Sequence, residues 1–204
     1  MIKRTYLIFA VVVVLVGIFA LVLLWPQPSV APAVPGNSVP LSSYDNGDFS
    51  LEDTTNYLVD EHYTYSAFGP GKEISGIKFV IPAAIALGTN LSADSYLSVE
   101  TIPGIEKACS ADQFLDLQNE TTAVMISENG KTYSFASSTG AGAGNRYEEW
   151  IYAVPSSSPC LAVRYFIHYG AIENYEPGTV MAFDKIALLK EFDSIRSSLR
   201  LIKQ

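Results

Sequence analysis

The glycine-rich segment 137–145, SSTGAGAGN, has residues that could bind an anion, and Arg146 and Tyr147 follow it. Exposed backbone N–H groups at Gly142, Gly144 and Asn145, together with the Arg146 guanidinium, could surround a negative charge. The segment matches neither the G-x-x-x-x-G-K-[ST] motif nor the G-x-G-x-x-G motif of phosphate-binding loops. No strand-to-helix transition, which both motifs require, follows it. This missing context favours the alternative, a flexible or bulged connection between two strands. We retain Gly142, Gly144, Asn145, Arg146 and Tyr147 as candidate ligand-binding residues.

Two histidines, His62 and His168, are present. A metal site would need both of them plus carboxylates, and the neighbouring residues lack ligand spacing, so no metal is expected. His168 lies in an apolar segment that is typical of a strand. It is either a hydrogen-bonded histidine of the sheet or a sixth ligand-binding residue.

Glu148 and Glu149 are adjacent in a predicted strand, so their side chains should point to opposite faces of the sheet. They therefore cannot form the facing carboxylate pair of a glycosidase. We expect one of them to point inward and pair with Arg146 or Arg164. No G-x-S-x-G motif is present. The sequence predicts no catalytic residue and no cofactor.

Several aromatic residues occur close to these polar residues, and they have two interpretations. They could form a ligand-binding surface, or they could form the strand core, which is the commoner use of such residues. The residues are Tyr147, Trp150, Tyr152, Tyr165, Tyr169 and Tyr175.

Antiparallel strands are predicted to position these residues. The Asn129-Gly130 dipeptide between two apolar runs is a strong hairpin signal. Cys160 to Tyr169 is the most apolar segment after residue 25 and should be a central strand. Ser110 and Gln113 form a capping-box pattern that opens a short helix from Ala111 to Leu117. Further strands are expected at 77–81, 96–102, 124–127, 132–136, 147–154 and 199–202.

The longest helix should lie near the C-terminus, with an apolar stripe on one side. The stripe consists of Phe183, Ile186, Leu189, Phe192 and Ile195. The predicted fold class is α+β: an antiparallel sheet packed by a long C-terminal helix and a short helix, preceded by one N-terminal transmembrane helix.

Residues 7–25 form an uncharged apolar run, LIFAVVVVLVGIFALVLLW, long enough to cross a bilayer as a helix. Lys3 and Arg4 precede it, and the next basic residue is Lys72, which predicts a cytoplasmic N-terminus. The alternative is a cleaved signal peptide, although signal apolar regions are usually shorter. We expect a single-pass membrane protein with 1–25 as cytoplasmic tip and anchor, 26–56 as a linker, and 57–204 as a periplasmic or extracellular domain.

Export would place Cys109 and Cys160 in an oxidising compartment, where a disulfide between them is expected. Such a bond would stabilise the domain by about 4 kcal/mol. Buried thiols or a redox pair are the alternatives, but no C-x-x-C motif is present. The net charge is −8, and all 21 acidic residues follow residue 44. This acidic balance argues against nucleic acid as a partner.

Several short phrases resemble those of a known fold family. The phrase GIKFVIP at 76–82 and the phrase FDSIRSSL at 192–199 resemble the layout of PsbP-like domains. The phrases GTNLS at 88–92, AGNRYEE at 143–149 and NYEPG at 174–178 resemble a set of envelope-anchored bacterial proteins with such a domain. The resemblance covers residues 75–202 and implies a binding or assembly role. Photosystem association is not implied, because nothing else in the chain supports it.

Two hypotheses for the function follow. The first is a membrane-anchored binding or assembly module with an envelope protein or a small ligand as partner. The second is an envelope hydrolase or another enzyme. A buried, perturbed carboxylate near His168 would favour the enzyme, and a shallow aromatic surface would favour the binding module.

Overall fold

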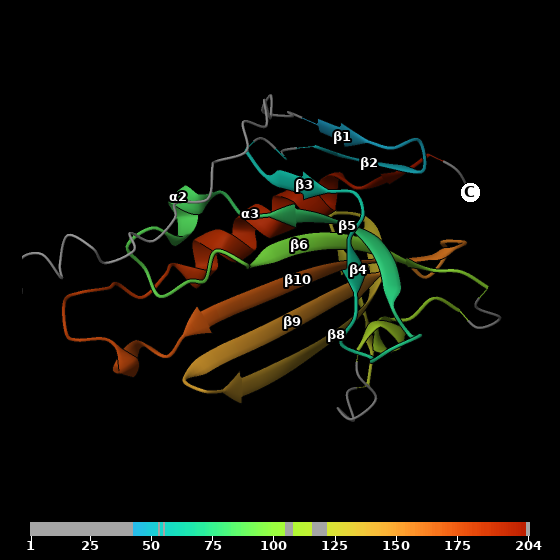
Figure 1. The fold of residues 1–204 in the computed structure, drawn as a ribbon. Helices are drawn as coiled ribbons and strands as arrows, with labels where there is room; N and C mark the ends of the chain where they lie inside the picture. The colour runs from blue at the N-terminus through green and yellow to red at the C-terminus, as the bar shows by residue number, and fades with distance from the viewer. Residues whose placement is uncertain (1–42, 53, 55, 105–107, 116–121, 203–204) are drawn as a thin grey trace, which may run out of the picture. The chain divides into compact units, whose positions relative to one another are not determined.

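The computed structural model describes residues 43–202 except 53, 55, 105–107 and 116–121 (Figure 1). The described residues have the predicted α+β fold of antiparallel strands and a long C-terminal helix. The strands are β1 (Ser43–Asp45), β2 (Phe49–Glu52), β3 (Leu58–Asp60), β4 (Thr64–Tyr65), β5 (Ile74–Val80), β6 (Tyr96–Ile102), β7 (Val124–Glu128), β8 (Lys131–Gly142), β9 (Asn145–Ala153), β10 (Cys160–Gly170) and β11 (Arg200–Leu201). The helices are α2 (Ala83–Ala86), α3 (Lys185–Ser198) and two 3-10 turns, η1 (Ala111–Phe114) and η2 (Ile172–Asn174).

The strands form two sheets. The large sheet has the order β3-β5-β6-β10-β9-β8-β7, with β4 paired to β5, and the small sheet has the order β1-β2-β11. β10 is central, as its apolar sequence predicts. Asn129 and Gly130 adopt φ values of 51° and 76° in the turn between β7 and β8, which confirms the predicted hairpin.

Helix α3 packs on one face of the large sheet, which we call the helix face (Figure 1). Asp184 caps its N-terminus by accepting the backbone N–H of Ala187. Phe192 and Ile195 are buried, and the ring of Phe192 lies 5.0 Å from that of Tyr165 in β10. Ile186, however, is 81% exposed. Its place in the predicted stripe is wrong, because nine residues at 3.6 per turn put Ile186 and Ile195 on opposite sides of the helix.

The other face, which we call the open face, is covered at one end by η1 and β4. The predicted disulfide between Cys109 and Cys160 is present, with Cα atoms 5.1 Å apart and a sequence separation of 51. It fastens the segment before η1 to the start of β10. The capping box of Ser110 and Gln113 is also present, but the helix is a 3-10 turn that ends at Phe114. Leu115, expected inside the helix, has an extended backbone, and the expected residues 116–117 lie outside the described residues.

The small sheet begins before the expected domain boundary. Tyr44, Phe49 and Leu51 of β1 and β2 are buried in the same apolar cluster as Phe79 and Phe192. These strands fall inside the range 26–56 that the sequence assigns to a linker, so the packed domain starts before residue 57. Among the described residues, no helix is long and apolar enough to cross a membrane. The predicted anchor at 7–25 lies outside the described residues.

Candidate functional site

The glycine-rich segment is part of a long hairpin, which corrects the expectation of a loop. β8 continues to Gly142, and a two-residue turn of Ala143 (φ 49°) and Gly144 (φ 83°) leads into β9. Left-handed φ at both turn residues is what a type I′ hairpin requires. The small residues of this segment lack the apolar alternation by which strands are recognised in sequences. Gly144 also accepts hydrogen bonds through its carbonyl from Ala171 N (2.8 Å) and Asn174 Nδ2 (2.9 Å).

The structure stacks the side chains of two of the six candidate residues. Tyr147 of β9 lies directly across from His168 of β10, and their rings stack with centroids 4.5 Å apart. Arg146 belongs to the helix face, where it lines a shallow cavity of about 290 Å³ with Tyr169 and Lys185. The remaining candidates, Gly142, Gly144 and Asn145, lie at the tip of the hairpin.

Aromatic side chains continue from this pair across the open face. Phe166 lies 6.2 Å from Tyr147 and stacks on Tyr96 at 5.0 Å, and Tyr96 in turn contacts Tyr63 at 5.4 Å. We call these five residues, Tyr63, Tyr96, Phe166, Tyr147 and His168, the aromatic row. The row crosses β6, β10 and β9 on the face opposite α3, where no helix of the described residues covers them (Figure 1). Four of the five side chains remain partly accessible, and Tyr96 is buried.

Charged residues flank both ends of the row. His168 Nδ1 lies 2.8 Å from the carboxylate of Asp94, whose side chain is 62% exposed. At the other end, the Lys78 ammonium lies over the rings of Tyr63 (4.9 Å) and Tyr96 (5.7 Å). Burial raises the pKa of both tyrosines, so their hydroxyls stay neutral and share a hydrogen bond of 2.6 Å. The row therefore offers ring surface with polar groups at its margins.

Most of the other aromatic residues serve the core. Tyr152 and Tyr165 are buried on the helix face, and Trp150 and Tyr169 pack against that core. Tyr175 is exposed beside η2. The sequence could not separate these groups, because Tyr147 differs from its neighbours only in the face to which it points.

Glu148 and Glu149 point to opposite faces, as predicted. Glu148 accepts the Tyr169 hydroxyl (2.9 Å) and pairs with Lys185 on the helix face. Burial opposes its ionisation, but the bonds from Lys185 and Tyr169 outweigh burial and lower the pKa of Glu148. Glu149 lies 3.2 Å from Arg164 on the open face, which confirms that one of the two acids pairs inward with an arginine.

The buried Arg164 organises the covered end of the open face. Its guanidinium makes two hydrogen bonds of 2.8 Å with Glu100, donates to the Phe114 carbonyl at 2.7 Å, and stacks on Tyr65 at 3.5 Å. Glu100 and Arg164 are both fully buried. The role of Glu100 was not recognised in the sequence, although a single charged residue inside a strand with a predominantly apolar sequence is the signal that could have indicated it.

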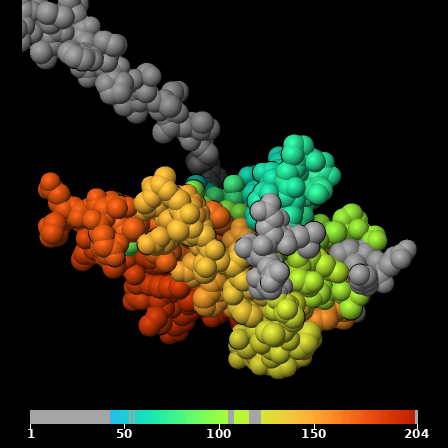
Figure 2. All heavy atoms as spheres, turned by 90° about the horizontal axis from the view of Figure 1, so that it is seen from below, coloured from blue at the N-terminus to red at the C-terminus, as the bar shows by residue number. Residues whose placement is uncertain are grey.

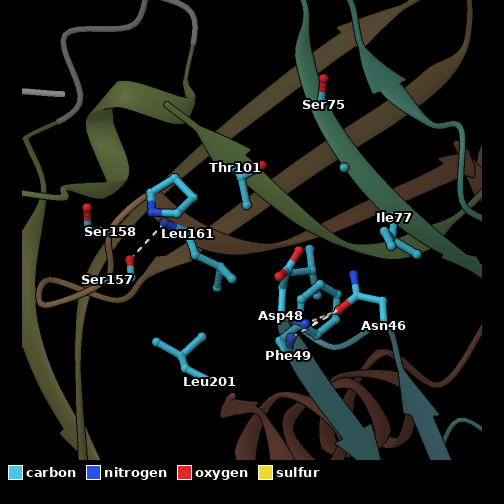
Figure 3. Close-up of a pocket in the computed structure, with 13 residues that line it drawn as sticks. Asn46, Asp48, Phe49, Ser75, Ile77, Thr101, Ser157, Ser158, Leu161 and Leu201 are labelled. Atoms are coloured by element: carbon cyan, nitrogen blue, oxygen red, sulfur yellow. Dashed lines mark hydrogen bonds between the residues drawn. The ribbon is translucent and has the colours of Figure 1, made fainter. Parts of the chain in front are cut away.

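A separate cavity of about 510 Å³ lies where the small sheet meets the large one (Figure 3). Its walls combine apolar side chains with hydroxyls: Phe49, Ile77, Val99, Leu161 and Leu201 with Ser75, Thr101 and Ser157. Several polar groups at its rim are used in turns. Asn46 Oδ1 accepts the N–H groups of Asp48 and Phe49, and Ser157 Oγ accepts that of Leu161 (Figure 3). Its size suits a small apolar ligand, but none of the six candidate residues lines it.

Comparisons with known proteins assign no family. No family model matches the chain, and no curated protein matches it. A crystal structure of a protein from Bacteroides thetaiotaomicron VPI-5482 is similar at 13% sequence identity and a TM-score of 0.43. The similarity covers 81% of this chain and 50% of that one, so this chain spans about half the length of the structure it matches.

Proposed function

We propose that the protein is a membrane-anchored binding or assembly module whose α+β domain lies on the outer side of the membrane. The apolar run at 7–25 with its basic flank supports the anchor. The observation that carries the binding role is the aromatic row, because tyrosine rings are common anchors at recognition surfaces. The PsbP-like resemblance is consistent with this role.

The enzyme hypothesis has less support. It requires a buried, perturbed carboxylate near His168, but Asp94, the acid that contacts this histidine, is largely exposed. His168 Nε2 is buried and makes no hydrogen bond within the described part of the chain. The imidazole contacts the Asp94 carboxylate through Nδ1 and stacks on the Tyr147 ring, and no hydroxyl or thiol among the described residues bonds to its Nε2.

Site-specific photo-crosslinking in the native cell tests the binding role. A photoreactive phenylalanine at position 147 should give a discrete adduct, and the same group at Leu87, which is 82% exposed, serves as the matched control. Equal labelling from both positions, or none from 147, would reject the aromatic row as a binding surface. Carbonate extraction of membranes tests the anchor: release of the full-length protein would contradict it.

A further inference from the structure

β8 is an edge strand over the second half of its length. β7 pairs only with Lys131–Phe135 of β8. Within the described ranges, no strand pairs with the outer side of Ala136–Gly142. Figure 1 shows this end of β8 at the margin of the large sheet. The residues from Thr139 to Gly142 are exposed, and Figure 2 shows the tip of the β8–β9 hairpin (gold) at the surface of the molecule.

Backbone groups of this edge point outward at regular intervals. The two-residue turn makes Gly142 and Asn145 a hydrogen-bonded pair, and such pairs alternate with non-bonded ones along the ladder. Thr139 and Ala141 therefore direct their N–H and C=O groups away from β9. The pairing of β9 with β10 is consistent with this alternation. The backbone N–H of His168 donates to Ser95 Oγ, away from Tyr147, so Tyr147 and His168 are a non-hydrogen-bonded pair and the backbone groups of Tyr147 face β8.

Among the described residues, the edge shows no protection against strand addition. Natural edges are commonly blocked by lysine, proline, a bulge or a very short strand. The segment from Ala136 to Gly142 contains no charge and no proline, and its register with β9 is unbroken. By contrast, the edge at the other side of the large sheet, β3, has only three residues.

The side-chain surface beside this edge has room for a large group. One face of the Tyr147 ring stacks on His168, and on its other side lies Gly140, its cross-strand neighbour in β8. A methyl group added to Gly140 would sit 3.8 Å from the Tyr147 Cβ, and one added to Gly142 would meet nothing within 4 Å. A side chain from the next strand position, about 10 Å from Tyr147, can therefore lean over Gly140 and reach that ring.

We propose that the outer edge of β8, from Ala136 to Gly142, accepts an extended segment of a partner protein as an additional strand of the large sheet. The outward N–H and C=O groups would bind its backbone, and an aromatic or large aliphatic side chain would lie over Gly140 against Tyr147. This inference rests on the proposed binding role and specifies its partner as an extended protein segment. The net charge of −8 favours a segment flanked by basic residues and opposes a second copy of this chain.

A labelled synthetic peptide tests strand addition to the full-length protein in detergent micelles. The peptide alternates threonine with valine or phenylalanine between lysine pairs, and fluorescence anisotropy measures its affinity. We expect binding, together with slower hydrogen exchange at Thr139 and Ala141. Thr139→Pro should weaken binding by about tenfold, because it removes one outward N–H and obstructs the edge without breaking a bond to β9. Thr139→Val, which keeps that N–H, should bind as the parent does.

The outcomes separate this inference from the proposed function. Equal peptide affinity for Thr139→Pro and the parent, or no binding of this peptide, would overturn strand addition at β8. Crosslinks from position 147 in cells would still uphold a binding role in that case. If sedimentation shows that the parent is dimeric and Thr139→Pro is monomeric, the edge joins two copies of this chain, and the choice of a foreign peptide is wrong.

Discussion

Arg164 and Arg196 are buried on opposite faces of the large sheet, and both lie over tyrosine rings. Arg196 lies 3.9 Å from the Tyr152 ring and 4.8 Å from the Tyr133 ring. The acids differ: Glu100 and Glu149, paired with Arg164, have 0% and 15% side-chain exposure, whereas Glu128 and Asp193, paired with Arg196, have 45% and 47%. Water can replace an exposed partner but cannot reach a buried one. The exposure of the acid should therefore determine how much each pair matters for stability.

The largest expected effect follows from breaking the fully buried pair. Glu100→Gln leaves the Arg164 charge without its bidentate partner, and the free energy of unfolding should fall by about 3–5 kcal/mol in urea denaturation. If this variant does not fold, the free energy of unfolding of the double variant Glu100→Leu with Arg164→Met tests the same comparison. The double variant should recover part of the loss, because the fully buried pair is removed while Glu149 keeps its hydrogen bonds from Tyr65 and Ser138. A single-variant loss below about 1 kcal/mol, as for an exposed pair, would contradict the comparison.

Removing the disulfide should have the next largest effect and should act on the Arg164 side. The disulfide restrains the segment before η1. Phe114, the last residue of η1, accepts a hydrogen bond from Arg164 through its carbonyl. Replacing both Cys109 and Cys160 by serine should lower the free energy of unfolding by about 2–4 kcal/mol. Reductant should destabilise the parent by a similar amount and leave the double variant unchanged. A reductant effect of equal size on both proteins would show that the disulfide is not the cause.

Glu148 and Lys185 give an intermediate case, since the acid is buried and the base is 41% exposed. The lowered pKa of Glu148 means that the unfolded chain binds this proton more readily than the folded one. The contribution to stability is therefore present above the unfolded pKa and is lost as the pH falls through the folded pKa. Lys185→Ala should cost about 1 kcal/mol at neutral pH. It should also reduce the loss of stability between neutral and acidic pH, and an unchanged pH profile would count against this assignment.

The smallest effect is expected for an acid of the Arg196 cluster. Glu128→Gln removes an exposed carboxylate, while the Tyr165 hydroxyl and Asp193 still contact the guanidinium. The free energy of unfolding should change by less than about 0.5 kcal/mol. High salt should reduce even this difference, because exposed pairs are screened. A loss as large as that of Glu100→Gln would show that partner exposure does not set the cost.

Local signals predicted the regular parts of the fold. The Asn129-Gly130 turn, the capping box of Ser110 and the apolar run from Cys160 each depend on neighbouring residues only. The α3 stripe was less well predicted, because steps of three residues resemble helical spacing but drift around the helix. β1 and β2 were missed because their buried residues contact segments far along the chain, as in the pairing of Phe49 with Leu201.

The candidate site was predicted only in part for a related reason. Tyr147 and His168 were chosen separately, but their contact depends on the β9–β10 register, which no local motif encodes. Tyr63 and Tyr96 come from segments that precede these residues by many positions, so no spacing joins them to the row. The glycines were noticed for their exposed N–H groups, whereas in the structure the absence of side chains at Gly140 and Gly142 leaves space beside an aromatic ring.

The pairing within the small sheet determines how the domain would respond to mechanical force. Within the described residues, β1 pairs only with β2, through three residue pairs that start at Ser43 and Glu52, so a pull along the preceding chain loads this hairpin first. Antiparallel pairs loaded from one end open one after another, whereas β2 is held also by β11 through Ser50 and Phe49. A pull on the N-terminal side would therefore detach β1 and withdraw Tyr44 from the core before it strains the large sheet and the surfaces that this sheet carries.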